Sequence, residues 1–347
     1  MDRIIRVLVV DDSAYVRKVM RQMLSRSPFI EVVGVAHDGV EALELVEELK
    51  PDVVTLDLIM PRMDGLGFLQ AQMARRPIPV VICSIASESG EMALKALELG
   101  AIDFIEKPTA LATERIFEIS NDLIEAVKTA GQVAPHSIAP LAARGTPLMA
   151  LDAVNRQHVA DAVVIGISTG GPQALRYLIP QFPADFPAPI AMVLHMPVGY
   201  TEMYAAKLNE ISRLHVQEAH EGDVMRPGVA LLAPAGRHLS LTRDADDQIV
   251  AHLDARPFDT PHRPAVDVLF RSAAEVYRSR LLGVVMTGMG NDGMQGAAWI
   301  KAQGGTIFSE AEESCVVYGM PRSVVEAGLS DRVVPLERMA QAIMEMV

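Results

Sequence analysis

The stretch AVVIGISTGGP, residues 162–172, joins an apolar run to a glycine-rich turn and the start of a helix. Consecutive valine and isoleucine residues without polar alternation are typical of a strand that is covered on both faces of a parallel sheet. Pro172 stands in the first helical turn, where proline is favoured. The pattern predicts an α/β fold with its functional groups in the loops that follow the strands.

The rest of the second half continues this pattern. Further strands are expected at 190–194, 281–287, 306–308 and 332–334, and helices at 172–179, 201–211, 266–277, 294–302 and 336–346. Residues 229–253 alternate in polarity around Asp-Ala-Asp-Asp at 244–247, which predicts an antiparallel hairpin appended to the sheet. We therefore expect a doubly wound, mostly parallel α/β sheet with an antiparallel hairpin over residues 158–347.

The first half alternates strands and helices five times. The strand-like runs lie at 5–10, 32–36, 53–56, 79–84 and 102–105, and the helical patterns at 15–24, 39–49, 65–73, 91–99 and 112–129. This alternation predicts a flavodoxin-like (βα)5 domain over residues 1–128. Residues 129–157 are rich in Ala, Pro, Gly and His and have no period, so they are interpreted as an interdomain linker, with a tail packed on one domain as the alternative.

Composition excludes several classes of protein. The net charge is −13, and no cluster of Lys and Arg suggests a nucleic-acid partner. The uncharged stretches fall short of the roughly 20 apolar residues of a membrane-spanning helix, so no membrane insertion is expected. The first residues do not form a secretory signal, and two cysteines, Cys83 and Cys315, cannot form a disulfide framework. These observations favour the cytoplasm.

Polar side chains gather at the predicted strand ends of the first half. Asp11 and Asp12 follow the first strand, Asp57 the third, Ser84 ends the fourth, and Lys107 follows the fifth. Neighbouring carboxylates repel one another unless a hard cation or a shared proton compensates. This set of groups fits a phosphoryl group accepted on Asp57 next to a divalent cation.

These residues resemble the response-regulator receiver domain over about residues 4–127. The resemblance lies in VVDDS (9–13), DLIMPRMDG (57–65), Ser84 and Lys107-Pro108. It implies that Asp57 is the phosphoacceptor, and that Asp11, Asp12, Asp57 and the backbone carbonyl of Ile59 hold Mg²⁺. It also implies that Ser84 and Lys107 contact the phosphoryl group, that Phe104 is the aromatic switch residue, and that Lys107-Pro108 is a cis peptide.

The turn at residues 166–170 matches Gly-x-Ser-x-Gly between a strand and a helix, which is the pattern of a nucleophile elbow. On these residues alone, a helix cap by Ser168 or Thr169 and a phosphate-cradling turn remain open. His195 ends an apolar strand run and is the predicted base, with His262 as the main alternative. Asp292, in the loop after residues 281–287, completes a predicted triad of Ser168, His195 and Asp292.

The same loop allows a second interpretation. Residues 288–293, GMGNDG, fit Gly-x-Gly-x-x-Gly after a strand, and Glu310 lies about 20 residues further on, as in dinucleotide-binding folds. Against this, Asp292 would place a carboxylate where a pyrophosphate must bind.

The second half resembles the catalytic domain of the chemotaxis protein-glutamate methylesterases, the CheB family, over about residues 160–345. The shared segments are 166–171, 195–197, 262–270, 287–293 and 314–321. The resemblance implies the Ser168, His195 and Asp292 triad, and the backbone N–H groups of Thr169 and Met289 are candidate oxyanion donors.

The implied reaction is hydrolysis of glutamate γ-methyl esters on the cytoplasmic helices of methylated chemoreceptors, with release of methanol, and deamidation of receptor glutamines. A chemotaxis histidine kinase is the implied phosphodonor, and the esterase reaction is expected to need no cofactor. A receiver-linked dinucleotide-binding enzyme and a non-enzymatic response regulator are the alternatives.

Overall fold

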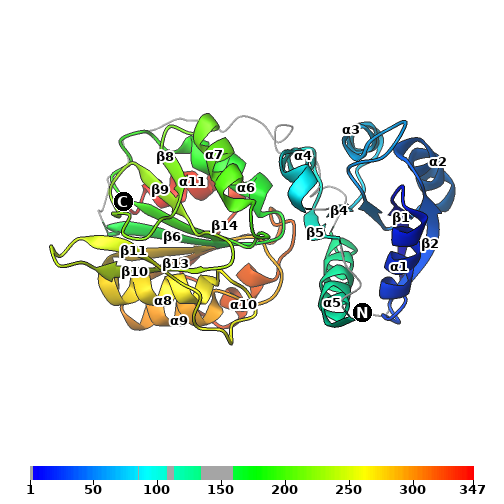
Figure 1. Cartoon of the computed structure of the whole chain (residues 1–347). Coiled ribbons are helices and arrows are strands. Elements are labelled where there is room, and N and C mark those ends of the chain that lie inside the picture. The colour runs from blue at the N-terminus through cyan, green and yellow to red at the C-terminus, as the bar shows by residue number, and fades with distance from the viewer. Residues whose placement is uncertain (1–2, 85, 108–112, 134–158) are drawn as a thin grey trace. The chain divides into compact units, whose positions relative to one another are not determined.

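The computed structural model describes residues 3–84, 86–107, 113–133 and 159–347, and the chain forms two compact units, Met1–Arg144 and Gly145–Val347 (Figure 1). Most of the predicted linker, residues 134–157, lies outside the described residues. Its first two residues, Thr129 and Ala130, complete the last helix of the first unit. The domain limits at residues 128 and 158 stay predictions.

The first unit is a five-stranded parallel sheet in the order β2-β1-β3-β4-β5. The strands are β1 (Ile5–Val10), β2 (Ile30–Ala36), β3 (Val53–Leu56), β4 (Val80–Ser84) and β5 (Asp103–Glu106). The helices are α1 (Ala14–Leu24), α2 (Gly39–Leu49), α3 (Gly65–Arg75), α4 (Ala86–Glu98) and α5 (Thr113–Ala130). Helix α1 contacts α5, and α3 contacts both α2 and α4, so the two groups cover opposite faces. The predicted (βα)5 fold is confirmed.

One glycine brings the start of α3 against the end of β3. A Cβ atom on Gly65 would lie 2.3 Å from the backbone oxygen of Asp57, a distance that no side chain tolerates. Asp64 caps the helix by accepting the N–H of Gly67 at 2.7 Å. The loop between Asp57 and α3 is therefore held close to the strand end.

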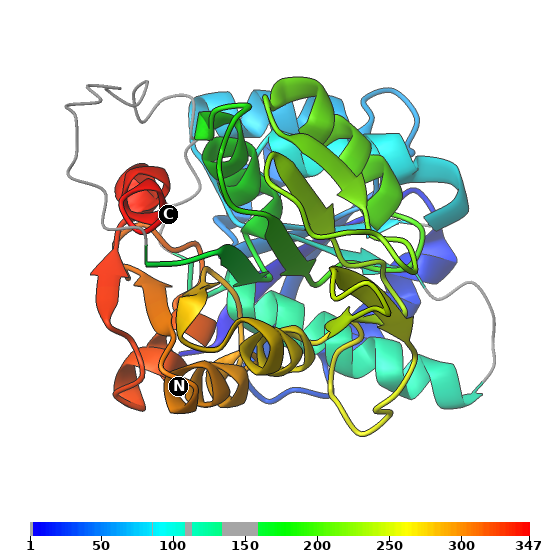
Figure 2. The ribbon, with the colours of Figure 1, turned by 90° about the vertical axis from the view of Figure 1, so that its left-hand side faces the viewer.

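The second unit is a seven-stranded parallel sheet in the order β14-β13-β12-β6-β7-β9-β8. The strands are β6 (Ala162–Ile167), β7 (Ile190–Leu194), β8 (His215–Glu218), β9 (Val229–Leu232), β12 (Leu281–Val285), β13 (Thr306–Glu310) and β14 (Arg332–Val334). The helices are α6 (Gly171–Leu178), α7 (Thr201–Ile211), α8 (Val266–Tyr277), α9 (Met294–Ala302), α10 (Met320–Glu326) and α11 (Leu336–Met344). Figure 1 shows α6, α7 and α11 on one face of the sheet and α8, α9 and α10 on the other. Figure 2 shows the edge strand β14 next to α11, both in red.

The hairpin differs from the prediction in extent and attachment. Residues 229–232 are not its first arm but β9, which pairs in parallel with β7 and β8. The antiparallel hairpin consists of β10 (His238–Arg243) and β11 (Ile249–Asp254), a separate two-stranded sheet that packs on α8. The reason is burial: all four residues of β9 are buried, as in an interior parallel strand, and polar alternation begins only with β10. Strand β8 and helix α10 were not predicted.

Helix α8 lies directly on the central strand β6. A Cβ atom on Gly166 would lie 2.2 Å from Cγ1 of Val266, the first residue of α8. Val266, Leu269 and Phe270 belong to the buried core cluster on this face of the sheet. The packing brings the N-terminus of α8 to the end of β6 that carries the glycine-rich turn. None of the described helices is both long and apolar enough to span a membrane.

Candidate functional site

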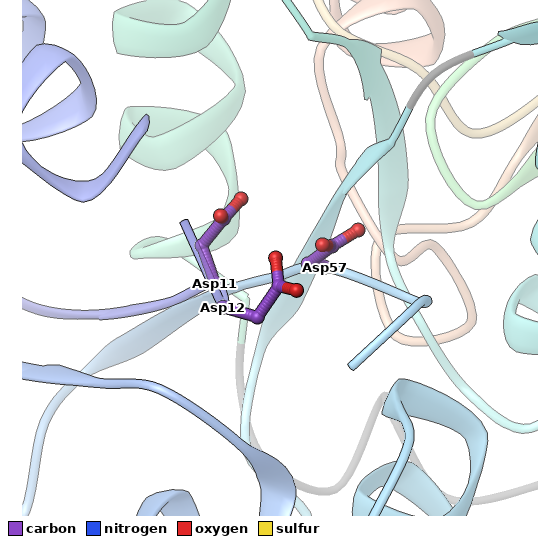
Figure 3. A group of neighbouring side chains, drawn as sticks. All are labelled: Asp11, Asp12 and Asp57. Atoms are coloured by element: carbon purple, nitrogen blue, oxygen red, sulfur yellow. The ribbon is translucent and has the colours of Figure 1, made fainter. Parts of the chain in front are cut away.

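Three carboxylates meet at the carboxyl ends of strands in the first unit. Asp11 and Asp12 follow β1, Asp57 follows β3, and one oxygen from each lies within 4.8 Å of the others (Figure 3). Lys107, after β5, places Nζ 2.7 Å from Oδ2 of Asp11 and 2.6 Å from Oδ2 of Asp57. The structure thus brings together the acidic residues and the lysine that the sequence predicted for this edge.

The electrostatics leave this cluster short of positive charge. Burial raises the pKa of Asp57, and the negative charge of Asp11 adds to that effect, although Lys107 opposes it. Burial alone would lower the pKa of Lys107, but its hydrogen bonds to Asp11 and Asp57 prevail and raise it. The cluster has three carboxylates, and the ammonium of Lys107 contacts two of them, so the site fits a hard divalent cation bound by oxygen ligands.

The neighbouring strand end supplies the hydroxyl. Ser84 is buried at the end of β4, and its backbone oxygen accepts the N–H of Lys107 at 2.9 Å. Ile59 lies in the loop after β3 and donates its N–H to Oδ1 of Asp57 at 3.4 Å. Phe104 is buried in β5 opposite Ile82. The predicted cis peptide at Lys107-Pro108 lies outside the described residues.

In the second unit, Ser168 and His195 follow neighbouring strands that are in register. Ile167 of β6 is the Cα partner of Leu194 of β7, and the N–H of His195 donates to the oxygen of Ile167 at 3.2 Å. Strand β12 lies on the other side of β6, and the N–H of Ser168 donates to the oxygen of Thr287 at 2.9 Å. The loops that carry the predicted serine, histidine and aspartate therefore emerge from three adjacent strands.

His195 is hydrogen-bonded to the predicted acid. Its Nε2 lies 2.9 Å from Oδ2 of Asp292, which assigns the ring proton to Nε2. Among the residues that the structure describes, the buried Nδ1 atom of His195 has no hydrogen-bond partner. In serine proteases the aspartate binds Nδ1 of the histidine and the serine faces Nε2. Here the aspartate binds Nε2, so the two ring nitrogens have exchanged these positions. Nδ1 is the nitrogen left to accept a proton.

Asp292 binds the N-terminus of α8 as well as His195. Its Oδ2 accepts the N–H of Val266 at 2.8 Å, and its Oδ1 accepts the N–H of Asp267 at 2.9 Å. Burial alone would raise the pKa of Asp292, but the hydrogen bond and charge of His195 and the two backbone donors outweigh it and lower the pKa. A helix N-terminus favours an anion, so Asp292 is held in the ionised form.

His262, the alternative base, lies against the predicted one. The two rings stack with centroids 4.2 Å apart and planes 26° apart. Desolvation by the surrounding groups and the nearby His195 lower the pKa of His262 to about 4. The carboxylate of Asp292 is hydrogen-bonded to His195, so of the two candidate bases it is His195 that binds the predicted acid.

Gly288 brings the loop after β12 onto the serine. A Cβ atom on Gly288 would lie 2.8 Å from Cβ of Ser168, and the oxygen of Gly288 accepts the N–H of Met320 at 2.8 Å. The candidate oxyanion donors are the next residues along the chain: Thr169 follows Ser168, and Met289 follows Gly288. Their role stays a prediction.

In the structure, residues of the dinucleotide pattern bind groups of the protein itself. The N–H groups of Gly293 and Gly296, at the start of α9, donate to Oδ1 of Asp267 at 2.9 and 2.7 Å. Glu310 is fully buried and accepts the N–H of Thr287 at 2.9 Å. A carboxylate already fills the helix N-terminus that a pyrophosphate would need, and Glu310 points into the protein. Both facts speak against a dinucleotide site.

Two residues of this arrangement, Thr287 and Asp267, had no predicted role in the site, and Glu310 was considered only as the acid of the alternative dinucleotide site. Thr287 could have been suspected because it ends a predicted strand with a polar side chain, and Glu310 because it lies two residues beyond the predicted strand 306–308. Asp267 lies inside one of the segments that carry the family resemblance. The signal that was missing is spatial, since each of these residues binds the backbone of a distant segment.

Comparisons with known proteins agree with this geometry. A family model described as CheB methylesterase matches residues 163–343, and one described as response regulator receiver domain matches residues 7–118. The chain belongs to the CheB methylesterase family. A protein-glutamate methylesterase/protein-glutamine glutaminase 5 of Myxococcus xanthus is 52% identical over 337 residues, which cover 96% of each chain. A protein-glutamate methylesterase/protein-glutamine glutaminase of Symbiobacterium thermophilum is 45% identical and covers 99% of this chain and 97% of its own.

A solved structure supports the fold of the second unit. The crystal structure of the Thermotoga maritima CheB methylesterase catalytic domain matches with a TM-score of 0.53 and 43% identity, over 54% of this chain and 99% of that chain. The chain is thus a member of the CheB family that combines a receiver domain with the methylesterase fold.

Proposed function

We propose that this chain hydrolyses glutamate γ-methyl esters on chemoreceptors, and deamidates receptor glutamines, through Ser168, His195 and Asp292. The observation that carries the proposal is the hydrogen bond between His195 and Asp292 at the sheet edge where Ser168 follows the adjacent strand. The names of the relatives from Myxococcus xanthus and Symbiobacterium thermophilum supply the substrate class.

The first half of the reaction forms an acyl-enzyme. Ser168 Oγ attacks the ester carbonyl and passes its proton to Nδ1 of His195, while Asp292 stabilises the imidazolium through Nε2. The backbone N–H groups of Thr169 and Met289 stabilise the oxyanion, and one such donor contributes about 3 kcal/mol. The tetrahedral intermediate collapses, and His195 protonates the leaving methoxide, which departs as methanol.

The second half is hydrolysis of the acyl-enzyme. His195 removes a proton from water, the resulting nucleophile attacks the acyl carbon, and the glutamate side chain is released as Ser168 regains its proton. With a glutamine substrate the acyl-enzyme is the same and ammonia replaces methanol. No step calls for a cofactor in the second unit.

Control of this activity is assigned to the first unit. A chemotaxis histidine kinase would transfer a phosphoryl group to Asp57, with Ser84 and Lys107 against the phosphoryl oxygens. Asp11, Asp12, Asp57 and the backbone carbonyl of Ile59 would hold Mg²⁺, which would neutralise charge on the phosphoryl group. Residues 129–157 would join this switch to the esterase, and the whole protein would act in the cytoplasm, where the receptor helices are exposed.

The test is covalent labelling combined with turnover. A serine-directed fluorophosphonate should label the full-length chain at Ser168, and Ser168→Ala should abolish labelling and lower methanol release from a methylated receptor fragment by about 10⁴-fold or more. Ser279→Ala is the control, because Ser279 is exposed and lies just before β12, at the opposite end of that strand. Near-normal turnover in Ser168→Ala would mean that the nucleophile lies elsewhere.

A further inference from the structure

The N-termini of helices α8 and α9 cap each other: an acid at the start of each helix accepts backbone N–H groups at the start of the other. Asp292, which precedes α9, accepts the N–H groups of Val266 and Asp267 at the start of α8. Asp267, in the first turn of α8, accepts the N–H groups of Gly293 and Gly296 at the start of α9. Asp292 therefore caps α8, and Asp267 caps α9. Asp267 takes part in both caps, because its N–H donates to Asp292 and its carboxylate accepts the N–H groups of α9.

This arrangement has an electrostatic cost. Burial raises the pKa of Asp267, and the negative charge of Asp292 raises it further, although the N–H groups of α9 oppose both effects. Two like charges this close would be disfavoured at a site that served packing alone. The two helix N-termini compensate because each one faces a carboxylate.

The close contact between α8 and α9 restricts the backbone of the loop that carries Asp292. A Cβ atom on Gly296 would lie 2.5 Å from Cβ of Phe270 and 3.1 Å from Cα of Asp267, so the two helices touch at the backbone. Gly293 has a φ of +97°, a left-handed conformation that favours glycine. The bond from its N–H to Asp267 fixes the peptide group that directly follows Asp292.

We propose that Asp267 is the positioning residue for the acid of the triad: it holds the Asp292–Gly293 peptide so that the carboxylate of Asp292 faces Nε2 of His195. The proposal rests on the proposed function, because it assigns a role to a neighbour of Asp292. It adds a fourth side chain to the site, one that acts through the position of Asp292.

The test compares three substitutions in the full-length chain. Asp267→Asn keeps an oxygen that can accept both N–H groups, Asp267→Glu keeps the charge but moves the acceptor by one methylene group, and Asp267→Ala removes the acceptor. Because misplacement by about 1 Å can lower a rate about 100-fold, we expect kcat for methanol release to fall about 10- to 100-fold in the Ala and Glu variants. KM should stay unchanged, and the Asn variant should recover kcat to within about 5-fold of the wild type.

A purely structural role would give a different pattern, and Asp331 supplies the control. Asp331 precedes β14 and accepts the N–H of Ile307, near the start of β13, at 2.8 Å. It therefore ties backbone segments at the amino ends of the strands, away from the carboxyl ends where Ser168 and His195 lie. Asp331→Ala should lower the melting temperature and leave kcat unchanged. If Asp267→Glu folds and keeps the wild-type kcat, or if the Asn and Ala variants lose kcat equally, the positioning role is wrong.

The rate of fluorophosphonate labelling separates this inference from the proposed function. If wild-type Ser168 is not labelled and Ser168→Ala keeps its turnover, the proposed function itself is wrong. If wild-type Ser168 is labelled and Asp267→Glu is labelled at the wild-type rate, only the role of Asp267 is wrong. The expected result is slower labelling in Asp267→Glu and Asp267→Ala than in Asp331→Ala.

Discussion

The backbone N–H of Thr287 donates to the fully buried carboxylate of Glu310 at 2.9 Å. Thr287 in turn holds the loop that carries Ser168, because its oxygen accepts the N–H of Ser168 and its hydroxyl donates to the oxygen of Thr169, both at 2.9 Å. The other oxygen of Glu310 accepts the hydroxyl of Ser314 at 2.9 Å. A buried acid on β13 is thus linked through a single residue, Thr287, to the serine that follows β6.

This relationship predicts that Glu310→Ala damages both stability and rate. It leaves the N–H of Thr287 unpaired in a dry interior, which costs about 1–3 kcal/mol and corresponds to a fall in melting temperature of about 2–10 °C. Fluorophosphonate labelling of Ser168 should slow as the loop loosens. Glu310→Gln is the matched control because it keeps an acceptor, and equal losses in both variants would contradict the explanation.

Asp292→Asn should inactivate the enzyme without unfolding it. With its oxygen in the place of Oδ1, the amide still accepts the N–H of Asp267, but its N–H₂ group then faces Nε2 of His195 and the N–H of Val266 and cannot accept a hydrogen bond from either. The ring then adopts the tautomer with the proton on Nδ1, and kcat falls by about 10⁴-fold. Methanol release measures this loss, and a fall of less than about tenfold would show that Asp292 does not orient the base.

The same residue predicts a pH dependence of stability. The pKa of Asp292 is lowered in the folded state, so its contribution to the free energy of unfolding is present above the ordinary pKa of about 4 and is lost as the pH falls through the lowered value. Melting temperatures measured between pH 7 and pH 3 should therefore fall more steeply for the wild type than for Asp292→Asn. Parallel curves would contradict the assignment.

Substitutions of His262 decide between the two candidate bases. Its pKa of about 4 keeps the ring uncharged at neutral pH, where it covers one face of His195. His262→Phe should retain kcat within about 3-fold, whereas loss of a general base would cost about 10²- to 10⁴-fold. His262→Lys places a permanent charge beside the imidazolium and should lower kcat by about tenfold or more. A collapse of activity in His262→Phe would make His262 the base.

The acidic cluster of the first unit predicts a stabilising effect of Mg²⁺. The pKa of Asp57 is raised, so the stability it contributes is present below its ordinary pKa and lost as the pH rises through the raised value. At pH 7 its ionised form therefore opposes folding, and Asp57→Asn should raise the melting temperature of the metal-free protein, by about 3–6 °C for each kcal/mol of free energy gained. Mg²⁺ should stabilise the wild type and have little effect on Asp57→Asn. Calorimetry with a chelator as reference measures both effects.

Phosphorylation of Asp57 is expected to raise esterase activity. Beryllofluoride with Mg²⁺, a stand-in for the phosphoryl group, should increase methanol release by the full-length chain roughly 5- to 100-fold, the range of ordinary allosteric coupling. Asp57→Asn is the control and should not respond. Deleting residues 1–150 should also raise activity if the first unit inhibits the second. A response in Asp57→Asn would place the effect elsewhere.

Local pattern was sufficient to predict most of the fold. Uninterrupted apolar runs such as 162–167 identified interior parallel strands, and their order along the chain identified both α/β units. The hairpin was placed too early because only five residues separate the apolar strand β9 from the alternating residues of β10. A strand joins the main sheet or a separate hairpin according to the partner it meets in space, which local polarity does not encode.

The candidate site was predictable to the extent that its residues end strands. Ser168, His195 and Asp57 do so directly, and parallel strands gather their ends at one edge. The use of Nε2 of His195 by Asp292, and the roles of Asp267 and Glu310, depend on side-chain directions and on contacts between segments far apart in the chain. Short sequence windows carry no information on such contacts.

The register of β6 and β7 also limits how the length of this chain can change. Ile167 pairs with Leu194, and deletion of one residue from either strand would turn the following side chain to the other face of the sheet. The hairpin turn between β10 and β11 has exposed residues at 245–248 and bears no part of the site. Insertions and deletions fixed during the evolution of such sequences should accumulate in that turn and be absent from the two strands.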